Sequence, residues 1–389
     1  MTDLNDYLEP VSIEKPEFED LEGPAGFSHN LSISTESNPV KEPWKYKIAL
    51  IGVPDDRNSL NRGCSKGPDI IRKRLYMLAR VPGKTKAADL GNIRTGVTFE
   101  DTVSGLAYVM YHLVKAGTIP VIIGGSSALS LAVDRCFSEM GHRYTLACID
   151  SRIDFTPNRE ETDSRNYLNR IIYGNKSAIG HFVNIGYQTY LNDYQSVNRL
   201  LKRKAELVRI GDAMQALHLT EPLMRDSDAV LFDIAAVRQS DAPGTRFTSP
   251  NGFYGEEICL LSRYAGISDS LKIFGIFEVN PDLDNNFQTS DLAAQIIWFF
   301  IEGAGQKQNE ADFLDDQTSG RFTRYHVHVA DMEDDMIFVR SNITDRWWME
   351  IHTPKGTIKY ASCSHEDYLL ANKNEIPERW FRAVEKFSF

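Results

Sequence analysis

Short apolar runs alternate with longer segments of mixed character through the middle of the chain. The runs are rich in isoleucine, valine and leucine, as is typical of buried strands, and they span residues 47–54, 118–125, 144–151, 181–188, 228–237 and 271–281. Segments between them carry apolar residues at three- and four-residue spacing, which predicts helices over residues 67–80, 99–117, 128–141 and 289–303. This alternation predicts an α/β fold, with a mostly parallel sheet covered by helices on both faces.

The two ends of the chain differ from this pattern. Residues 1–45 are acidic, contain five prolines and show no sustained period, which indicates an arm laid over the surface or partly disordered. After residue 305, short runs predict antiparallel strands and a last helix, over residues 324–330, 336–342, 347–353, 358–364 and 376–387. We therefore expect an N-terminal arm (1–45), an α/β domain (46–305) and a small C-terminal appendage of strands and a helix (306–389).

The composition of the chain indicates which kinds of binding partner and which cellular compartment to expect. The chain of 389 residues is 42% apolar and carries a formal charge of −11, which argues against nucleic acid or an anionic membrane surface as a main partner. Its five cysteines show no metal-ligand or disulfide spacing. The first residues lack the regions of a signal peptide, and no apolar run approaches the ~20 residues of a membrane span. We expect a cytoplasmic protein without membrane insertion.

Acidic residues follow three of the predicted strands: Asp150 and Asp154, Asp233, and Glu278. Because ligands collect at the carboxyl ends of parallel strands, we expect these side chains to converge. Carboxylate oxygens suit hard cations such as Mn²⁺, Mg²⁺ or Ca²⁺. The other interpretation is a set of strand-end caps and salt bridges, which is the commoner role for any single acidic residue. Asp55, Asp56, Ser126 and Ser127 also follow predicted strands.

Five motifs in this order resemble those of the ureohydrolases, the superfamily of arginase, agmatinase and formimidoylglutamase. "IGVPDDRNSLNRGCSKGPDIIRKRL" is similar to the family's first strand and helix start, and "PVIIGGSSALS" to its GGDHS segment. "CIDSRIDF" resembles DAHxD, "LFDIAAVRQSDAPGT" resembles SFDxDxxDPxxAPGT, and "FEVNPDLD" resembles EVNPxxD. The resemblance covers about residues 47–303 and implies a three-layer arginase-like fold.

In active members of that family, two Mn²⁺ ions bridged by hydroxide attack an amidine or guanidinium carbon, and two histidines and four aspartates hold the ions. The resemblance implies a degenerate site here, because four motif positions carry other residues: Ser126 and Ser127 in place of the Asp and His of GGDHS, Arg152 in place of the His of DAHxD, and Ala235 in place of the second Asp of SFDxD. Three of the family's metal-ligand positions still carry aspartate, namely Asp150, Asp154 and Asp233. Glu278 corresponds to the family's substrate-facing glutamate. The histidine of the family's SGNxHG segment falls on Leu168.

Arg152 offers a substitute for a lost metal ion. Three clustered carboxylates repel one another, and a guanidinium can bind two of them through paired hydrogen bonds. We therefore expect the Arg152 side chain to point inward, among Asp150, Asp154 and Asp233, in the space of one Mn²⁺.

The leading hypothesis from the sequence is an inactive homologue. It would lack the dinuclear manganese centre and amidine hydrolysis, need no cofactor, and act as a homo-oligomeric binding or scaffold protein for a partner protein or a small cationic ligand. The alternative is residual hydrolysis of linear amidines, of the arginase or formimidoylglutamase type, with one weakly bound Mn²⁺ or other divalent cation on Asp150, Asp154 and Asp233. Ser127 would assist in that case.

Overall fold

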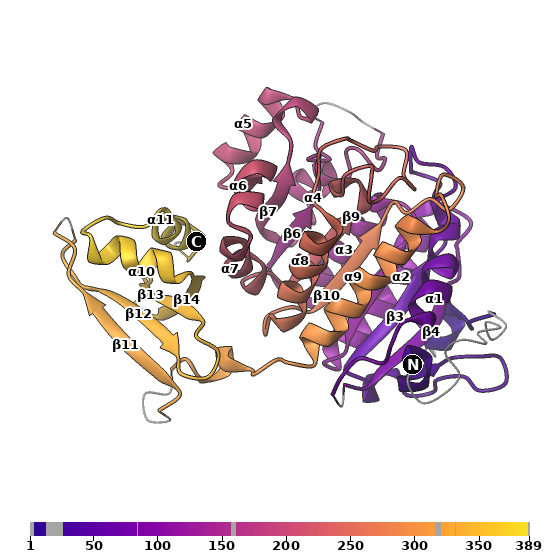
Figure 1. Cartoon of the computed structure of the whole chain (residues 1–389), viewed down its shortest axis with the longest axis horizontal. Helices are drawn as coiled ribbons and strands as arrows, with labels where there is room; N and C mark the ends of the chain where they lie inside the picture. Colours follow the sequence, from indigo (N-terminus) through magenta and orange to yellow (C-terminus); the bar gives the residue numbers. More distant parts are fainter. Residues whose placement is uncertain are drawn as a thin grey trace.

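The computed structural model describes residues 4–12, 26–83, 85–156, 161–315, 320–330 and 332–387. Residues 13–25, which belong to the predicted arm, lie outside this described part. A large α/β body and a smaller C-terminal body make up the molecule (Figure 1).

A ten-stranded sheet forms the centre of the large body, in the order β1-β4-β3-β5-β10-β9-β6-β7-β8, with β2 also paired to β4. All its pairs are parallel except β1 with β4. The strands are β1 (Leu8–Glu9), β2 (Leu31–Ile33), β3 (Ile48–Val53), β4 (Ala87–Ile93), β5 (Ile119–Gly124), β6 (Tyr144–Ile149), β7 (Ile179–Tyr187), β8 (Glu206–Arg209), β9 (Ala229–Asp233) and β10 (Ile273–Phe277). The predicted class, a mostly parallel sheet within an α/β domain, is confirmed.

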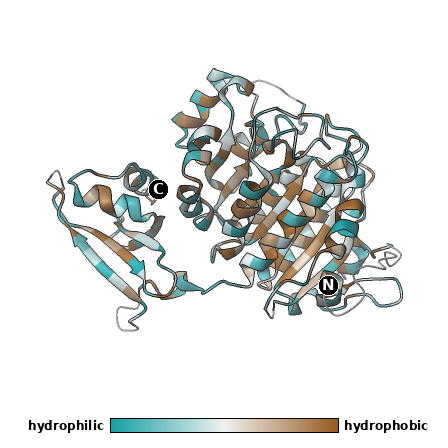
Figure 2. Ribbon diagram, viewed as in Figure 1, coloured by the Kyte–Doolittle hydropathy of each residue, from teal (hydrophilic) through white to brown (hydrophobic). Residues whose placement is uncertain are grey.

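Both faces of the sheet are buried, which explains why its strands read as unbroken apolar runs. In β3, Ile48 and Leu50 belong to one hydrophobic cluster, whereas Ala49 and Ile51 belong to another on the opposite face. The first cluster includes residues of α1 (Gly67–Met77), α8 (Gly255–Ile267) and α9 (Gln288–Ala304). The second includes residues of α2 (Phe99–Lys115) and α3 (Leu131–Met140). Figure 2 shows the apolar residues concentrated along the central strands and the adjoining helix faces.

Four shorter helices complete the large body: α4 (Leu168–Tyr173), α5 (Tyr194–Lys202), α6 (Ile210–Gln215) and α7 (Glu221–Arg225). Among the described residues, no helix is both long and apolar enough to cross a membrane.

The C-terminal body is a four-stranded antiparallel sheet in the order β11-β12-β13-β14. Its elements are β11 (Phe322–Val327), β12 (Met336–Ser341), β13 (Trp347–His352), β14 (Ile358–Cys363), α10 (His365–Asn372) and α11 (Glu378–Phe387). One face of the sheet packs with the two helices in a separate hydrophobic cluster, which includes Phe338, Trp347 and Ala383. This body therefore has its own small core.

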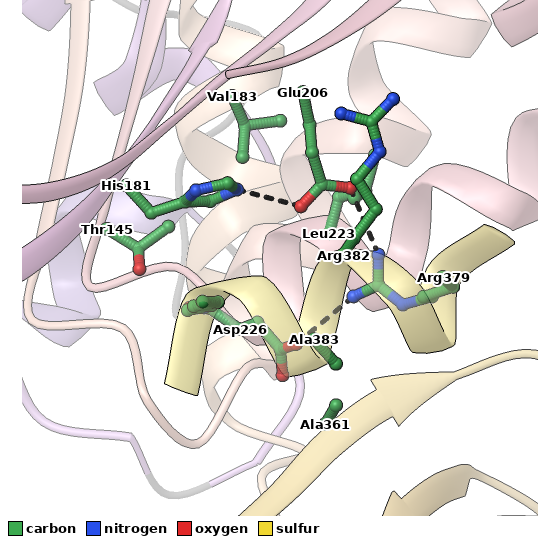
Figure 3. A pocket seen from close by; sticks show the side chains of 11 residues that line it. Thr145, His181, Val183, Glu206, Leu223, Asp226, Ala361, Arg379, Arg382 and Ala383 are labelled. Atoms are coloured by element: carbon green, nitrogen blue, oxygen red, sulfur yellow. Dashed lines mark hydrogen bonds and ion pairs between the residues drawn. The ribbon is translucent and has the colours of Figure 1, made fainter. Parts of the chain in front are cut away.

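Charged residues join the two bodies where α11 meets β7 and β8. His181 and Glu206 form a hydrogen bond of 2.8 Å between ring nitrogen and carboxylate. Arg379 of α11 lies 3.6 Å from the other Glu206 oxygen and 3.1 Å from Asp226 (Figure 3). These residues line a cavity of about 10 Å³, the size of one water molecule. The C-terminal body is thus attached by a largely buried ion-pair network.

Candidate metal centre

The carboxyl ends of four adjacent strands, β5, β10, β9 and β6, meet at one edge of the sheet. Asp150 follows β6, Asp233 ends β9, Glu278 follows β10, and Ser126 and Ser127 follow β5. The parallel topology therefore gathers residues that are up to about 150 positions apart in sequence, as the switch-point rule for such sheets predicts.

Three carboxylates form the centre of this region. Asp150, Asp154 and Asp233 each offer an oxygen, and these oxygens lie within 4.8 Å of one another. Asp150 accepts a hydrogen bond from the Arg152 backbone N–H at 2.9 Å, and Asp233 accepts one from the Ala235 N–H at 2.8 Å. Each hydrogen bond closes a local turn, in which the aspartate side chain accepts from the backbone N–H two residues further on. The turn fixes the direction of the aspartate side chain. We call these three residues the carboxylate triad.

Asp150 and Asp154 are buried and Asp233 is half-buried, so the ionised form of the triad is unfavourable without a cation. Burial raises the pKa of Asp150 well above its usual range, and the charge of Asp233 raises it further. Burial, with the charges of Asp150 and Asp233, does the same for Asp154. Burial also raises the pKa of Asp233 to about 6. Positive charge near the triad would lower all three pKa values.

Glu278 lies in the same buried region, held by two donors. Its carboxylate accepts hydrogen bonds from the Ser59 hydroxyl at 2.9 and 3.2 Å and from the Ser127 backbone N–H at 2.8 Å. Burial, together with the charge of Asp233, raises the pKa of Glu278 to about 8. Its φ of 65° is a left-handed value that is uncommon for a residue other than glycine. Such backbone conformations are concentrated at functional sites.

The substituted motif positions have ordinary structural roles in this fold. The Ser126 hydroxyl accepts a hydrogen bond from the Ala128 N–H and caps a 3₁₀ turn. The Ser127 hydroxyl donates to the Ser164 carbonyl at 3.0 Å. Ala235 and Leu168 are both buried, and Leu168 belongs to one of the two large hydrophobic clusters. None of these four side chains carries an imidazole or carboxylate that could complete a second ion site.

Arg152 does not lie where the sequence analysis placed it. Its guanidinium makes no ion pair within 4.0 Å of the triad, all of whose members are in the described part of the chain; its Nη1 instead donates to the Leu191 carbonyl at 3.4 Å. Among the described residues, Arg165 is the cation that pairs with the triad, with its Nε 3.7 Å from Asp154. The backbone explains the difference. The turn that directs the Arg152 N–H onto Asp150 leaves the side chain facing the segment before α5.

Sequence reasoning missed Ser59 and Arg165, because both come from loops without a recognisable period. Asp55 does not join the site, since it binds the guanidinium of Arg57 at 2.5 Å. Asp56 accepts hydrogen bonds from the Gly63 N–H and the Ser65 hydroxyl, and so supports the following loop. The only signal for Ser59 is its place in the loop after β3, at the same sheet edge.

The residues present fit one divalent cation but not two. Three convergent carboxylate oxygens, buried and electrostatically unfavourable on their own, are a donor set suited to a hard ion. A pair of ions would need the ligand positions that Ser127, Arg152 and Ala235 now occupy, and we derive no step through a second ion.

The fold and this site define the class, a parallel α/β protein with a carboxylate cluster at the carboxyl ends of its strands that could hold a metal ion. The model of the arginase family matches residues 46–302, and the chain belongs to this family. Formimidoylglutamase of Staphylococcus haemolyticus (strain JCSC1435) is 24% identical over 268 residues, which cover 66% of this chain and 86% of that protein. Formimidoylglutamase of Bacillus subtilis (strain 168) is 22% identical over 277 residues, covering 66% and 86%.

Two solved structures share the fold. Formiminoglutamase of Trypanosoma cruzi with Mn²⁺ superposes with a TM-score of 0.64 at 19% identity, covering 69% of this chain and 96% of that one. Formimidoylglutamase of Bacillus subtilis subsp. subtilis superposes with a TM-score of 0.66 at 19% identity, covering 76% and 98%.

These findings contradict the hypothesis of an inactive binding or scaffold protein, which is wrong. The curated relatives are hydrolases by name, and the triad keeps a geometry that can hold a metal ion. Although both imidazoles are replaced, the three remaining carboxylate oxygens lie close enough together to hold an ion.

Proposed function

We propose that this protein is a metal-dependent hydrolase that cleaves a C–N bond of a linear amidine. One observation carries the proposal: Asp150, Asp154 and Asp233 bring three carboxylate oxygens within 4.8 Å of one another. Asp150 and Asp154 are buried and Asp233 is half-buried, and the buried carboxyl group of Glu278 lies in the same region. Such a group of like charges is unfavourable unless a cation is bound, and clustered perturbed carboxyls are typical of functional sites.

The triad would hold a single divalent ion, with Mn²⁺ the first candidate because a related structure contains it. A bound ion of this kind lowers the pKa of water and so supplies hydroxide near neutral pH. Asp150 and Asp233 are directed by their own backbone turns, so two of the three ligands are positioned before any ion binds.

Glu278 would bind the cationic amidine. Ser59 and the Ser127 N–H hold its two oxygens, which leaves the carboxylate fixed in orientation. With a pKa of about 8, Glu278 can carry a proton at neutral pH, and an amidinium cation beside it would favour the ionised form. Its burial keeps competing water away from that contact.

Metal analysis combined with an activity assay tests the proposal. The full-length chain, equilibrated with Mn²⁺ and freed of excess, is expected to hold about one equivalent by elemental analysis. It is then assayed for formamide release from N-formimidoylglutamate and for urea release from arginine and agmatine. Asp154→Asn should lose both metal and turnover, with Asp134→Asn as a matched control, because Asp134 is a partly buried carboxylate that lies outside the site. Turnover that persists in chelator, or no turnover on any of the three compounds with the metal bound, would refute the proposal.

A further inference from the structure

A second hollow opens beside the triad, between the loop after β6 and the start of α5. It has a volume of about 400 Å³, within the range of small-molecule sites. Its polar lining includes three arginines, Arg152, Arg165 and Arg199, and one carboxylate, Asp193. A net positive lining is unusual on a chain whose formal charge is −11. We call it the arginine cavity.

Among the described residues, the lining has one carboxylate, Asp193, for its three arginines. Asp193 caps α5, and one of its oxygens accepts hydrogen bonds from the Ser196 N–H at 2.9 Å and the Ser196 hydroxyl at 3.0 Å. Those bonds, and to a lesser extent the positive charge of Arg199, lower the pKa of Asp193. One carboxylate against three arginines leaves the described lining with a net positive charge.

Arg152 is the least satisfied member. Its Nε is buried and has no hydrogen-bond partner among the residues that the structure describes, and its Nη1 contact to Leu191 is long, at 3.4 Å. A buried donor without a partner is costly, and a bound anion would supply the missing acceptor.

Arg165 connects the cavity with the triad. Its guanidinium lies over the Phe247 ring, 4.7 Å from the ring centroid, and its Nε lies 3.7 Å from Asp154. One arginine thus faces both an acidic region and a basic one. A ligand spanning the two would have a cationic end at the triad and Glu278 and an anionic end in the cavity.

We propose that the arginine cavity is an anion site, in which Arg152, Arg165 and Arg199 bind a carboxylate or phosphate group of a ligand. Guanidinium groups bind both kinds of anion through paired, charge-assisted hydrogen bonds. The cavity's role as a subsite for the anionic end of an amidine rests on the proposed function. Its binding of an anion does not.

Isothermal titration calorimetry on the full-length chain tests the site. Bound metal is first removed with EDTA, and the EDTA, itself a polycarboxylate, is removed by desalting before the titration. Glutarate serves as the probe for a carboxylate ligand, and inorganic phosphate as the probe for a phosphate ligand. The probe that binds with the higher affinity identifies the preferred anionic group. Arg152→Gln and Arg199→Gln should each weaken binding about tenfold, the size expected for one lost charge-assisted hydrogen bond. Arg199 is exposed on α5, so its substitution leaves the fold intact.

Lys202→Gln is the matched control, since Lys202 is an exposed cation on the same helix but does not line the cavity. It should change affinity by less than about twofold. If neither anion binds the wild-type protein, or if Lys202→Gln weakens binding as much as Arg199→Gln, the anion site is overturned. A parallel Mn²⁺ titration separates this outcome from a failure of the proposed function, because metal binding to the triad does not require Arg199.

Discussion

Glu206→Gln tests the ion-pair network that joins the two bodies. The Glu206 side chain is 17% exposed and bonds to His181, which is 9% exposed. Burial alone would raise its pKa, but the His181 hydrogen bond and the charge of Arg379 outweigh burial and lower the pKa of Glu206 from its ordinary 4.5 to about 2. Ionised Glu206 therefore stabilises the folded chain, and the glutamine variant removes that charge with little change in size.

The magnitude follows from the linkage between pKa and stability. A carboxyl that titrates at about 2 when folded and 4.5 when unfolded contributes roughly 3 kcal/mol when ionised in both states. Because the folded pKa is the lower one, the contribution is complete above pH 4.5 and is lost as the pH falls towards 2. We expect Glu206→Gln to destabilise the protein by about 3 kcal/mol at pH 7, and the difference to shrink to roughly 1.4 kcal/mol at pH 3.

Glu366→Gln provides a matched comparison within the same chain. His218 and Glu366 also join the two bodies through a 2.9 Å contact, but their side chains are 60% and 50% exposed. Exposed pairs of this kind contribute little, so we expect a change within about 0.5 kcal/mol. Urea unfolding at pH 7 and pH 3, followed by tryptophan fluorescence and circular dichroism, measures both variants. Equal stability of wild type and Glu206→Gln at pH 7, or a difference that does not shrink at pH 3, would refute the reasoning.

Three further predictions concern the site. Asp154→Asn should lower Mn²⁺ affinity at least tenfold in calorimetry while the protein still folds, because one of three ligands is weakened; an unchanged affinity would place the ion elsewhere. Mn²⁺ affinity should rise between pH 6 and 8, by about tenfold per pH unit for each proton that the ion displaces from Asp150 or Asp154, since burial raises the pKa of both carboxyls well above the usual range; Asp233, with a pKa of about 6, is mostly ionised there, and a flat profile would show that the other two are ionised as well. Arg152→Met should change the free energy of unfolding by less than about 1 kcal/mol, because this guanidinium pairs with no triad carboxylate; a loss of ~3–5 kcal/mol in urea melts would restore its interpretation as a substitute for the metal.

Much of the sheet could be predicted because strands buried on both faces must be apolar throughout. The apolar pattern does not predict strand β4, because this strand is not apolar throughout. Asp89 interrupts its apolar run, yet this aspartate is buried against Arg72 at 2.8 Å and Tyr76 at 2.8 Å. A strand that contains a buried, paired charge does not show an apolar run, so it cannot be predicted from the local sequence pattern.

The positions of Asp150, Asp233 and Glu278 near one another could be anticipated, because topology alone brings adjacent strand ends together. The direction of the Arg152 side chain could not. It depends on a backbone turn at Asp150 and on the contact with Leu191, neither of which leaves a trace in residue spacing. The arginine cavity likewise combines three segments, and only the folded chain shows that their guanidinium groups are neighbours.

The segments outside the region matched to the family lie at the two ends of the central sheet. At one end, β1 and β2 of the N-terminal arm both pair with β4. At the other end, α11 meets the start of β8, where Arg382 donates to the Ala205 carbonyl and Arg379 approaches Glu206. Unpaired strand edges are templates for intermolecular pairing. The arm therefore covers the outer edge of β4, and the C-terminal body contacts the start of β8. A chain trimmed to the family region would expose these strands, and we expect it to self-associate through them.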